Sequence, residues 1–347
     1  MNKTKYMYKK IISRILNKDF IKQDKAFFEY GLFDFENEKI FLDKENFHKI
    51  QNNEFNGQTC FIDGGSSELI KSSDIGLFFI RILGLIYKNN KKQKTIKKEF
   101  YALVTLTEDN KKQFYKFEKY NVDGELVEGD FLINIFDKTM MFGGKRVEIS
   151  QVGDLIRTLS EIKLAKDITQ ELHEQDIIVL DGNLEIDKTH KFEYFKELYE
   201  SAPKINICAL SKTCNIITNK NRSIVPAIFD LKPEQNEFYY HPLHKSEQEY
   251  DTTFVKLNKN SDYLFRLDFS KQSNIKIIMQ ALKNNSNDFT FPGYPYGLIV
   301  ADKFARISNK EKEYYLTILK TKSGDNWNII KKHINTLNAH DVLDHIS

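Results

Sequence analysis

The chain has 347 residues, of which 41% are hydrophobic and 29% are charged, and its formal net charge is +3. This composition argues against a disordered or coiled-coil protein, because it supplies enough apolar residues for a large core. The mild charge neither requires nor excludes a polyanionic partner. Three cysteines are too few for a disulfide framework or a four-ligand zinc site, so we expect free thiols in a reducing compartment.

The first 55 residues are rich in charged side chains and predict a helical N-terminal arm. An apolar stripe between Ile11 and Leu16 would give this arm a face for a second copy of the chain or another partner, and a helix lying on a membrane surface is the alternative. The N-terminus lacks the apolar segment of a signal peptide. The most apolar segment, 75–87, is interrupted by Arg81 and falls short of the roughly 20 residues that a membrane helix needs. We therefore expect a cytoplasmic protein without a membrane span.

Residues 56–347 alternate between strand and helix patterns, which predicts one large α/β domain. Segment 75–87 is typical of a strand that is buried on both faces. A long helix begins at Ser150, where apolar residues start to recur at helical spacing. The expected strands are 58–63, 75–87, 100–106, 114–120, 176–180, 205–210, 251–257 and 263–269. The expected helices are 150–175, 190–201, 274–282 and one that begins at Leu298 and runs past Tyr315.

Two of the expected strands stop at an Asp-Gly pair, one containing Asp63 and the other Asp181. Ligands of α/β sheets gather at the carboxyl ends of strands, and two carboxylates that meet there need a cation or a shared proton between them. Ordinary turn chemistry is the alternative interpretation of each pair.

Glu161 is a third candidate, because it shares a face of the long helix with Ala165 and Ile168. A carboxylate on a buried face needs a partner, since its desolvation is costly. Either a divalent cation held together with Asp63 and Asp181, or an ion pair with Arg157 at i−4, would supply that partner.

The order of these elements is that of a ribonuclease-H-like fold: a strand with Asp63, two antiparallel strands, a helix with Glu161, a strand with Asp181, a helix and a strand. Carboxylates at the strand ends of that fold bind hard cations, and all-oxygen ligation suits Mn²⁺ or Mg²⁺. Two such ions about 3.5–4 Å apart activate a water and stabilise the leaving oxygen of a phosphodiester. The pattern therefore predicts an α/β protein with a ribonuclease-H-like mixed sheet, flanking helices and a two-metal site.

Lysines at two places are candidates for contact with nucleic acid. Lys212 and Ser211 follow strand 205–210, the expected neighbour of the Asp181 strand, where they would hold a phosphate beside the cations. An ordinary surface lysine is the alternative for Lys212. The basic segment from Lys91 to Lys98 forms the tip of a hairpin, which either follows a DNA backbone or is simply solvated.

Four short motifs occur in a fixed order along the chain. They are Phe61-Ile62-Asp63-Gly64-Gly65-Ser66, Val179-Leu180-Asp181-Gly182-Asn183-Leu184, Leu210-Ser211-Lys212-Thr213 and Gly293-Tyr294-Pro295-Tyr296-Gly297-Leu298-Ile299-Val300-Ala301-Asp302. Together they resemble the NurA family of DNA-end-processing nucleases over roughly residues 55–320. The last motif is the most specific. Its tyrosines, Tyr294 and Tyr296, are suited to stacking on a base or donating to a phosphate, and an aromatic loop that seals the core is the alternative.

The resemblance implies a metal-dependent nuclease that acts as a homodimer with a hexameric HerA-type ATPase, in recombinational repair or phage defence. It also implies that Asp63, Glu161 and Asp181 are metal ligands and that Tyr294 lies near the scissile phosphate. Asp302 stands where the family often has histidine, and we expect it to complete the ligand set.

The leading hypothesis is a Mn²⁺- or Mg²⁺-dependent deoxyribonuclease with exonuclease and single-strand endonuclease activity. The alternative is a non-catalytic clamp or adaptor that holds DNA for a translocating ATPase. Four carboxylates favour the nuclease, because a clamp has no use for acids near phosphates. The sequence contains no Gly-x-x-x-x-Gly-Lys-Ser/Thr motif, so ATP-driven movement would have to come from a partner.

Overall fold

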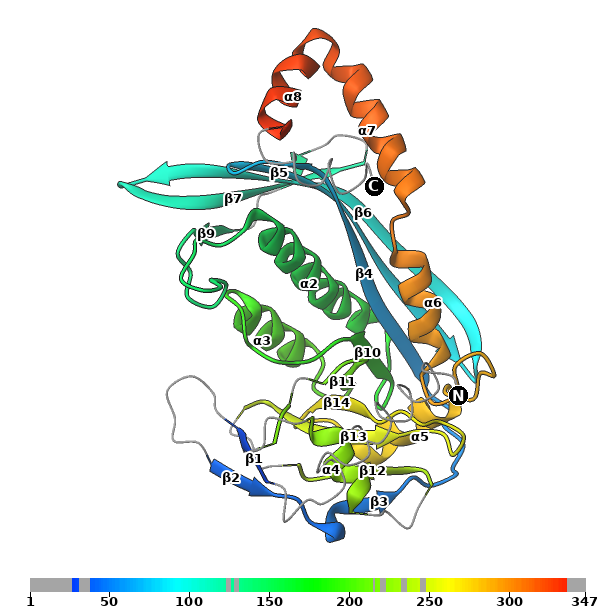
Figure 1. The fold of residues 1–347 in the computed structure, drawn as a ribbon. Coiled ribbons are helices and arrows are strands. Elements are labelled where there is room, and N and C mark those ends of the chain that lie inside the picture. Colours follow the sequence, from blue (N-terminus) through cyan, green and yellow to red (C-terminus); the bar gives the residue numbers. More distant parts are fainter. Residues whose placement is uncertain are drawn as a thin grey trace, which may run out of the picture.

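The computed structural model describes residues 27–30, 38–122, 126–127, 131–214, 216–218, 223–231, 236–243 and 248–335. Within these residues, twelve strands form one mixed sheet, with helices on both of its faces (Figure 1). The strands of this sheet are β3 (Phe47–Lys49), β4 (Gln58–Lys71), β5 (Ile75–Lys88), β6 (Lys91–Asp109), β7 (Lys112–Asn121), β8 (Leu126–Val127), β9 (Leu132–Asn134), β10 (Ile177–Asp181), β11 (Asn206–Ser211), β12 (Phe238–Tyr240), β13 (Tyr250–Lys256) and β14 (Phe265–Ser270). β1 (Phe27–Tyr30) and β2 (Glu38–Phe41) pair with each other in a separate two-stranded sheet.

The described residues form seven α-helices, three more than the four that the sequence predicted after residue 55. The α-helices are α2 (Ile149–Ile168), α3 (Lys191–Ser201), α4 (Ile224–Asp230), α5 (Ile275–Asn284), α6 (Tyr296–Ala305), α7 (Asn309–Ser323) and α8 (Trp327–Asn335). Three 3-10 turns accompany them, η1 (Lys44–Asn46), η2 (Thr169–Glu171) and η3 (Gly324–Asn326). None of the helices in the described part of the chain is long and apolar enough to cross a membrane.

The centre of the sheet has the order β6-β5-β4-β10-β11. β4, β5 and β6 are antiparallel to one another, whereas β10 runs parallel to both β4 and β11. Parallel neighbours need a crossover connection, which α2 and α3 provide. This arrangement confirms the predicted ribonuclease-H-like mixed sheet with flanking helices.

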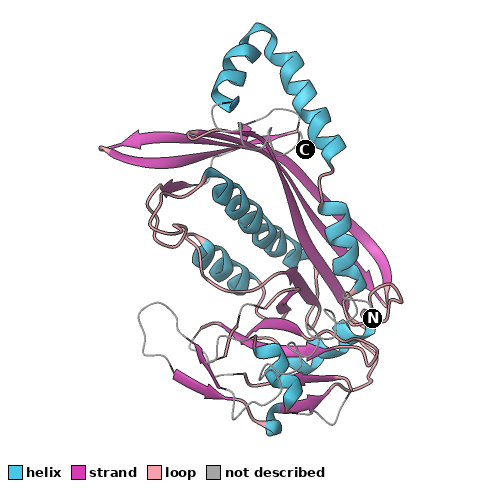
Figure 2. Cartoon of the chain, in the orientation of Figure 1, coloured by secondary structure: helices cyan, strands magenta, loops and turns pink. Residues whose placement is uncertain are grey.

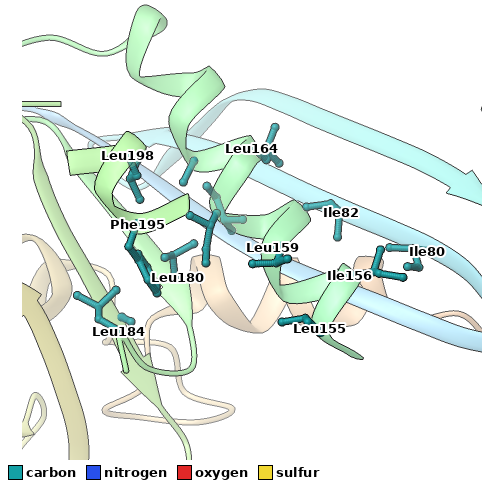
Figure 3. Packing of buried hydrophobic residues seen from close by; sticks show 14 of the residues in the cluster. Ile80, Ile82, Leu155, Ile156, Leu159, Leu164, Leu180, Leu184, Phe195 and Leu198 are labelled. Atoms are coloured by element: carbon teal, nitrogen blue, oxygen red, sulfur yellow. The ribbon is translucent and has the colours of Figure 1, made fainter. Parts of the chain in front are cut away.

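Both faces of the sheet are covered, and this explains the apolar run of β5. Alternate residues of a strand point to opposite faces. Ile82 accordingly packs with α2 on one face (Figure 3), while Leu83 belongs to the cluster under α6 on the other face. The α2 face includes Leu155, Leu159 and Leu180, and Figure 1 places α2 and α6 on opposite sides of the long strands.

β4 is longer than the sequence suggested, and the expectation that it stops at Asp63 was wrong. The strand continues through Gly64 and Gly65 because both glycines pair with β5, opposite Ile82 and Arg81. A Cβ atom at Gly64 would overlap the Glu161 carboxylate, and one at Gly65 would overlap the carbonyl oxygen at the end of α6. The two glycines therefore allow helices to approach β4 closely from both faces, and they make no turn.

The expected helical arm over residues 1–55 is also corrected where the structure describes it. Residues 38–49 form β2, a single 3-10 turn and β3, because β3 pairs with β12 and the Phe47 ring packs at 5.0 Å from the Tyr240 ring. This pairing partner lies almost 200 residues away in the sequence, where local patterns carry no trace of it. The apolar stripe between Ile11 and Leu16 lies outside the described residues.

The single helix expected from Leu298 past Tyr315 is in fact two helices, α6 and α7, with a short loop between them (Figure 2). Ser308 caps the second helix, and a capping box with Glu311 stabilises its start. Arg81 binds both sides of this junction, since its guanidinium donates to the Arg306 carbonyl at 3.1 Å and to the Glu311 carboxylate at 2.6 Å.

Candidate metal centre

Three aspartates from three separate elements meet at the middle of the sheet. Asp63 lies within β4, Asp181 ends the neighbouring parallel strand β10, and Asp302 lies on α6. One carboxylate oxygen from each lies within 4.8 Å of the other two. Asp63 is only 5% exposed, so the carboxyl of this residue lies inside the protein and not on its surface. The parallel register, in which Leu180 pairs with Ile62, brings Asp181 to the level of Asp63.

α6 reaches the sheet because small residues face it. Gly297, in the first turn of α6, lies against the Phe61 ring so closely that a Cβ atom would overlap the ring. Leu298 and Ala301 are fully buried on the same face of the helix. Asp302 is the next residue after Ala301, so it lies at the border of the contact between α6 and the sheet, beside Asp181.

Lys212 links two of the three aspartates. Its Nζ lies 2.8 Å from Asp181 Oδ2 and 3.2 Å from Asp302 Oδ1. Tyr294, which is 2% exposed, donates its hydroxyl to Asp181 Oδ1 at 3.2 Å. Arg306, one helical turn after Asp302, pairs with the other oxygen of that carboxylate at 2.8 Å. Asp181 thus accepts from Lys212 at Oδ2 and from Tyr294 at Oδ1.

Glu161 forms the ion pair with Arg157, one of the two partners that the sequence left open. It is 5% exposed on α2 and lies against Gly64, yet it also forms the i−4 ion pair with Arg157. Burial raises the pKa of Glu161 to about 7, and the nearby Asp181 contributes in the same direction, although Arg157 opposes the shift. Its oxygens are not part of the tight group formed by the three aspartates.

Asp63 is the most strongly perturbed of these acids. Burial, reinforced by the charges of Asp181 and Glu161, raises the pKa of Asp63 to about 8, while Lys212 and the Gly64 N–H oppose the shift. A carboxyl in this position favours a bound proton or a bound cation over a bare charge. Carboxylate oxygens grouped in this way fit a hard divalent cation such as Mg²⁺ or Mn²⁺. The residues present therefore suit the predicted metal.

Asp63 and Asp181 open onto a pocket of about 510 Å³, whose lining also includes Arg157, Lys212 and Arg266. Ser211 lines the pocket as well, but its hydroxyl donates to the Gly182 carbonyl oxygen at 2.5 Å and so holds the turn after β10. Positive and negative side chains share this pocket, an arrangement that suits a metal ion together with a phosphate.

Two of the predicted nucleic-acid contacts lie elsewhere. Tyr296 is 43% exposed and lies near Tyr87, outside the lining of this pocket. In the basic segment from Lys91 to Lys98, three lysines are already paired with carboxylates on the protein surface. These pairs are Lys94 with Glu171 at 2.5 Å, Lys97 with Glu99 at 3.0 Å and Lys98 with Asp167 at 2.5 Å.

A buried ion-pair network beside the pocket was not predicted from the sequence. The Arg266 guanidinium donates twice to Asp268, at 2.9 Å each, and once to Glu185 at 2.5 Å. Asp268 is fully buried and also accepts from the Leu184 backbone N–H at 3.1 Å and from the Thr252 hydroxyl at 2.8 Å. The network ties the loop after Asp181 to β14. Opposite charges at i and i+2 within the apolar strand 265–270 were the available signal.

Comparisons with known proteins agree with this architecture. The sequence matches the family model described as NurA domain over residues 57–307, which is most of the chain. The NurA nuclease from Sulfolobus solfataricus is similar in structure, with a TM-score of 0.53 and 15% identity, over 93% of this chain and 98% of that chain. Endonuclease V from Ciona intestinalis, in complex with DNA, is also similar, with a TM-score of 0.39 and 13% identity, over 72% of this chain and 84% of that chain. A comparison with curated proteins found no match.

The family match extends over all of the elements that supply Asp63, Glu161, Asp181 and Asp302, from β4 to the end of α6. The similarity in structure extends over nearly the whole of both chains. The chain therefore belongs to the NurA family of nucleases.

Proposed function

We propose that this protein is a Mn²⁺- or Mg²⁺-dependent deoxyribonuclease with Asp63, Asp181 and Asp302 as metal ligands and Glu161 as a further ligand. The observation that carries the proposal is the meeting of three carboxylates within 4.8 Å on a nuclease-family fold, beside a pocket that Arg157 and Lys212 also line. A divalent cation bound there would polarise the phosphodiester and lower the pKa of a coordinated water.

The other residues of the site have distinct parts in this proposal. Tyr294 orients Asp181 through its hydroxyl and lies near the scissile phosphate. The Lys212 ammonium, which is about half exposed at the pocket, binds a phosphate oxygen of the DNA, with Ser211 beside it. Tyr296 contacts DNA farther from the reacting bond, where its exposed ring is free to stack on a base.

The proposal includes exonuclease activity and endonuclease activity on single strands. It also includes action on DNA ends with a HerA-type hexameric ATPase, in the cytoplasm, in recombinational repair or phage defence. Family membership supports the partnership, and so does the lack of a nucleotide-binding Gly-x-x-x-x-Gly-Lys-Ser/Thr motif in the sequence. We further propose that the protein is a homodimer, with residues 1–55 in the contact with the second copy or with the ATPase.

The test uses single- and double-stranded DNA labelled at either end, incubated with Mn²⁺, Mg²⁺ or EDTA. Asp63→Asn removes a ligand charge with little change in shape. Asp262→Asn, on the exposed loop before β14, is the matched control. We expect metal-dependent cleavage by the wild type and by the control, and none by Asp63→Asn, while the label position gives the polarity.

Equal cleavage by all three proteins would point to a contaminant or to a different site. No cleavage by any of them, even after addition of a HerA-type ATPase and ATP, would favour the clamp over the nuclease.

A further inference from the structure

Arg157 is a charged residue of the pocket that the proposed hydrolysis leaves without a part. It lies on α2, and its guanidinium lines the same pocket as Asp63 and Asp181. Its side chain is 28% exposed, whereas that of its partner Glu161 is 6% exposed. The guanidinium therefore lies between the buried carboxylate and the open side of the pocket.

Among the residues that the structure describes, the guanidinium of Arg157 hydrogen-bonds to two acceptors. Its Nη1 binds the Glu161 carboxylate and lies 3.4 Å from the Gly64 carbonyl oxygen. Arg266, the other arginine of the pocket, is held quite differently, because all three of its nitrogens bind Asp268 or Glu185. Arg266 is a fixed part of the structure, whereas Glu161 is the one carboxylate hydrogen-bonded to Arg157 among the described residues, with the charges of Asp154 and Asp63 nearby.

We propose that Arg157 is a DNA phosphate-binding residue that Glu161 masks when the site holds no metal. The inference rests on the proposed function, in which Glu161 is a metal ligand. A carboxylate that serves as a metal ligand has less charge to offer a guanidinium, and the two cations repel each other. Arg157 already lines the pocket, so a phosphate oxygen of bound DNA is the anion within its reach. The planar guanidinium suits a phosphate, to which it donates two parallel hydrogen bonds.

This arrangement would couple DNA binding to metal binding. Without metal, Glu161 neutralises Arg157, and the pocket has little attraction for a phosphate. With Glu161 engaged as a ligand, the same guanidinium adds to the charge of Lys212 on the side from which DNA approaches. Two cations would then bind the strand that is positioned for cleavage.

The test removes the Glu161 charge by substitution and measures DNA binding in the absence of metal. Binding of a fluorescently labelled single-stranded oligonucleotide is measured by anisotropy in EDTA at low ionic strength, on the full chain. Glu161→Gln removes the masking charge and is expected to tighten binding about tenfold, as one charge-assisted contact would. The double variant Glu161→Gln with Arg157→Gln is expected to lose that gain.

A matched control separates masking from a general loss of negative charge. Glu185→Gln removes a carboxylate from the same pocket, but one that pairs with Arg266. Any gain from Glu185→Gln should persist when Arg157→Gln is added. If Arg157→Gln does not fold, Arg157→Lys replaces it; lysine keeps the charge but not the paired donors, so a gain of about threefold is expected.

The proposal is overturned if the gain from Glu161→Gln persists in the double variant, or if Glu161→Gln gives no more gain than Glu185→Gln. Because the measurement is made in EDTA, it is separate from the test of nuclease activity. A wild type that never cleaves DNA would end the proposed function, while this result would still report whether Glu161 masks Arg157.

Discussion

Asp63→Asn should stabilise the metal-free protein at alkaline pH while abolishing its response to metal. The Asp63 carboxyl is 5% exposed and lies beside Asp181 and Glu161, so its ionised form is disfavoured in the folded state. The folded protein therefore holds the proton more tightly than the unfolded chain does. The contribution of this group to stability is fully present below about pH 4 and is lost as the pH rises towards about 8.

The size of the effect follows from the pKa of Asp63, about 8 in the folded protein against an ordinary value of 3.8. Each unit of pKa difference corresponds to about 1.4 kcal/mol, which sets an upper limit of about 6 kcal/mol over the whole range. About two of these pH units lie between pH 6 and pH 8.5, which leaves at most about 3 kcal/mol in that window. We expect the metal-free wild type to lose about 2–3 kcal/mol more than Asp63→Asn across it.

Urea unfolding in EDTA at both pH values measures this difference, with Asp262→Asn expected to behave as the wild type. Mn²⁺ at about 100 times its Kd should then restore about 2.7 kcal/mol to the wild type at the higher pH, and nothing to Asp63→Asn. Equal pH dependence of the wild type and Asp63→Asn would mean that Asp63 is not the carboxyl whose pKa is raised in the folded protein.

Three further predictions concern single contacts. Tyr294→Phe keeps the buried ring but removes the bond to Asp181, so thermal unfolding should show a loss of about 1 kcal/mol and calorimetry a weaker affinity for Mn²⁺. Asp268→Asn leaves the buried Arg266 charge without its main partner and should cost about 3–5 kcal/mol in urea unfolding, with unchanged stability as the contradicting result. Gly65→Ala places a methyl group against the end of α6 and should cost about 1–3 kcal/mol in thermal unfolding; a neutral variant would mean that α6 moves away freely.

Local patterns were enough to predict the central elements. β5 is apolar along its length because both of its faces are covered. The apolar residues of α2 recur every 3.6 residues because one face of the helix is covered. β10 and β11 were predicted as strands 176–180 and 205–210 with a helix between them, and the structure shows that they pair in parallel. The order of these elements then placed Asp63 and Asp181 on neighbouring strands, and the structure confirms that they are neighbours.

Family membership could be predicted from the sequence motifs, whereas the ion-pair partners of each charged side chain depended on the fold. Glu161 was predicted either to join the aspartates or to pair with Arg157, and the structure shows the pair with Arg157. Lys212 was expected to face a phosphate, and the structure shows that it bridges Asp181 and Asp302. Such contacts join residues up to 90 positions apart, so no local period reports them.

The periods of the strands and helices, the order of the elements and the candidate acids could all be predicted from patterns among neighbouring residues. The continuation of β4 through Gly64 and Gly65 depends on the fold, because β5 pairs with both glycines where local patterns favoured a turn. The fold also sets where the last helix breaks, through the bonds of Arg81 to the junction, and it brings Asp302 on α6 to Asp181 on β10. These features depend on contacts between segments that are distant in the sequence. Such contacts stabilise the protein only once the sheet has formed.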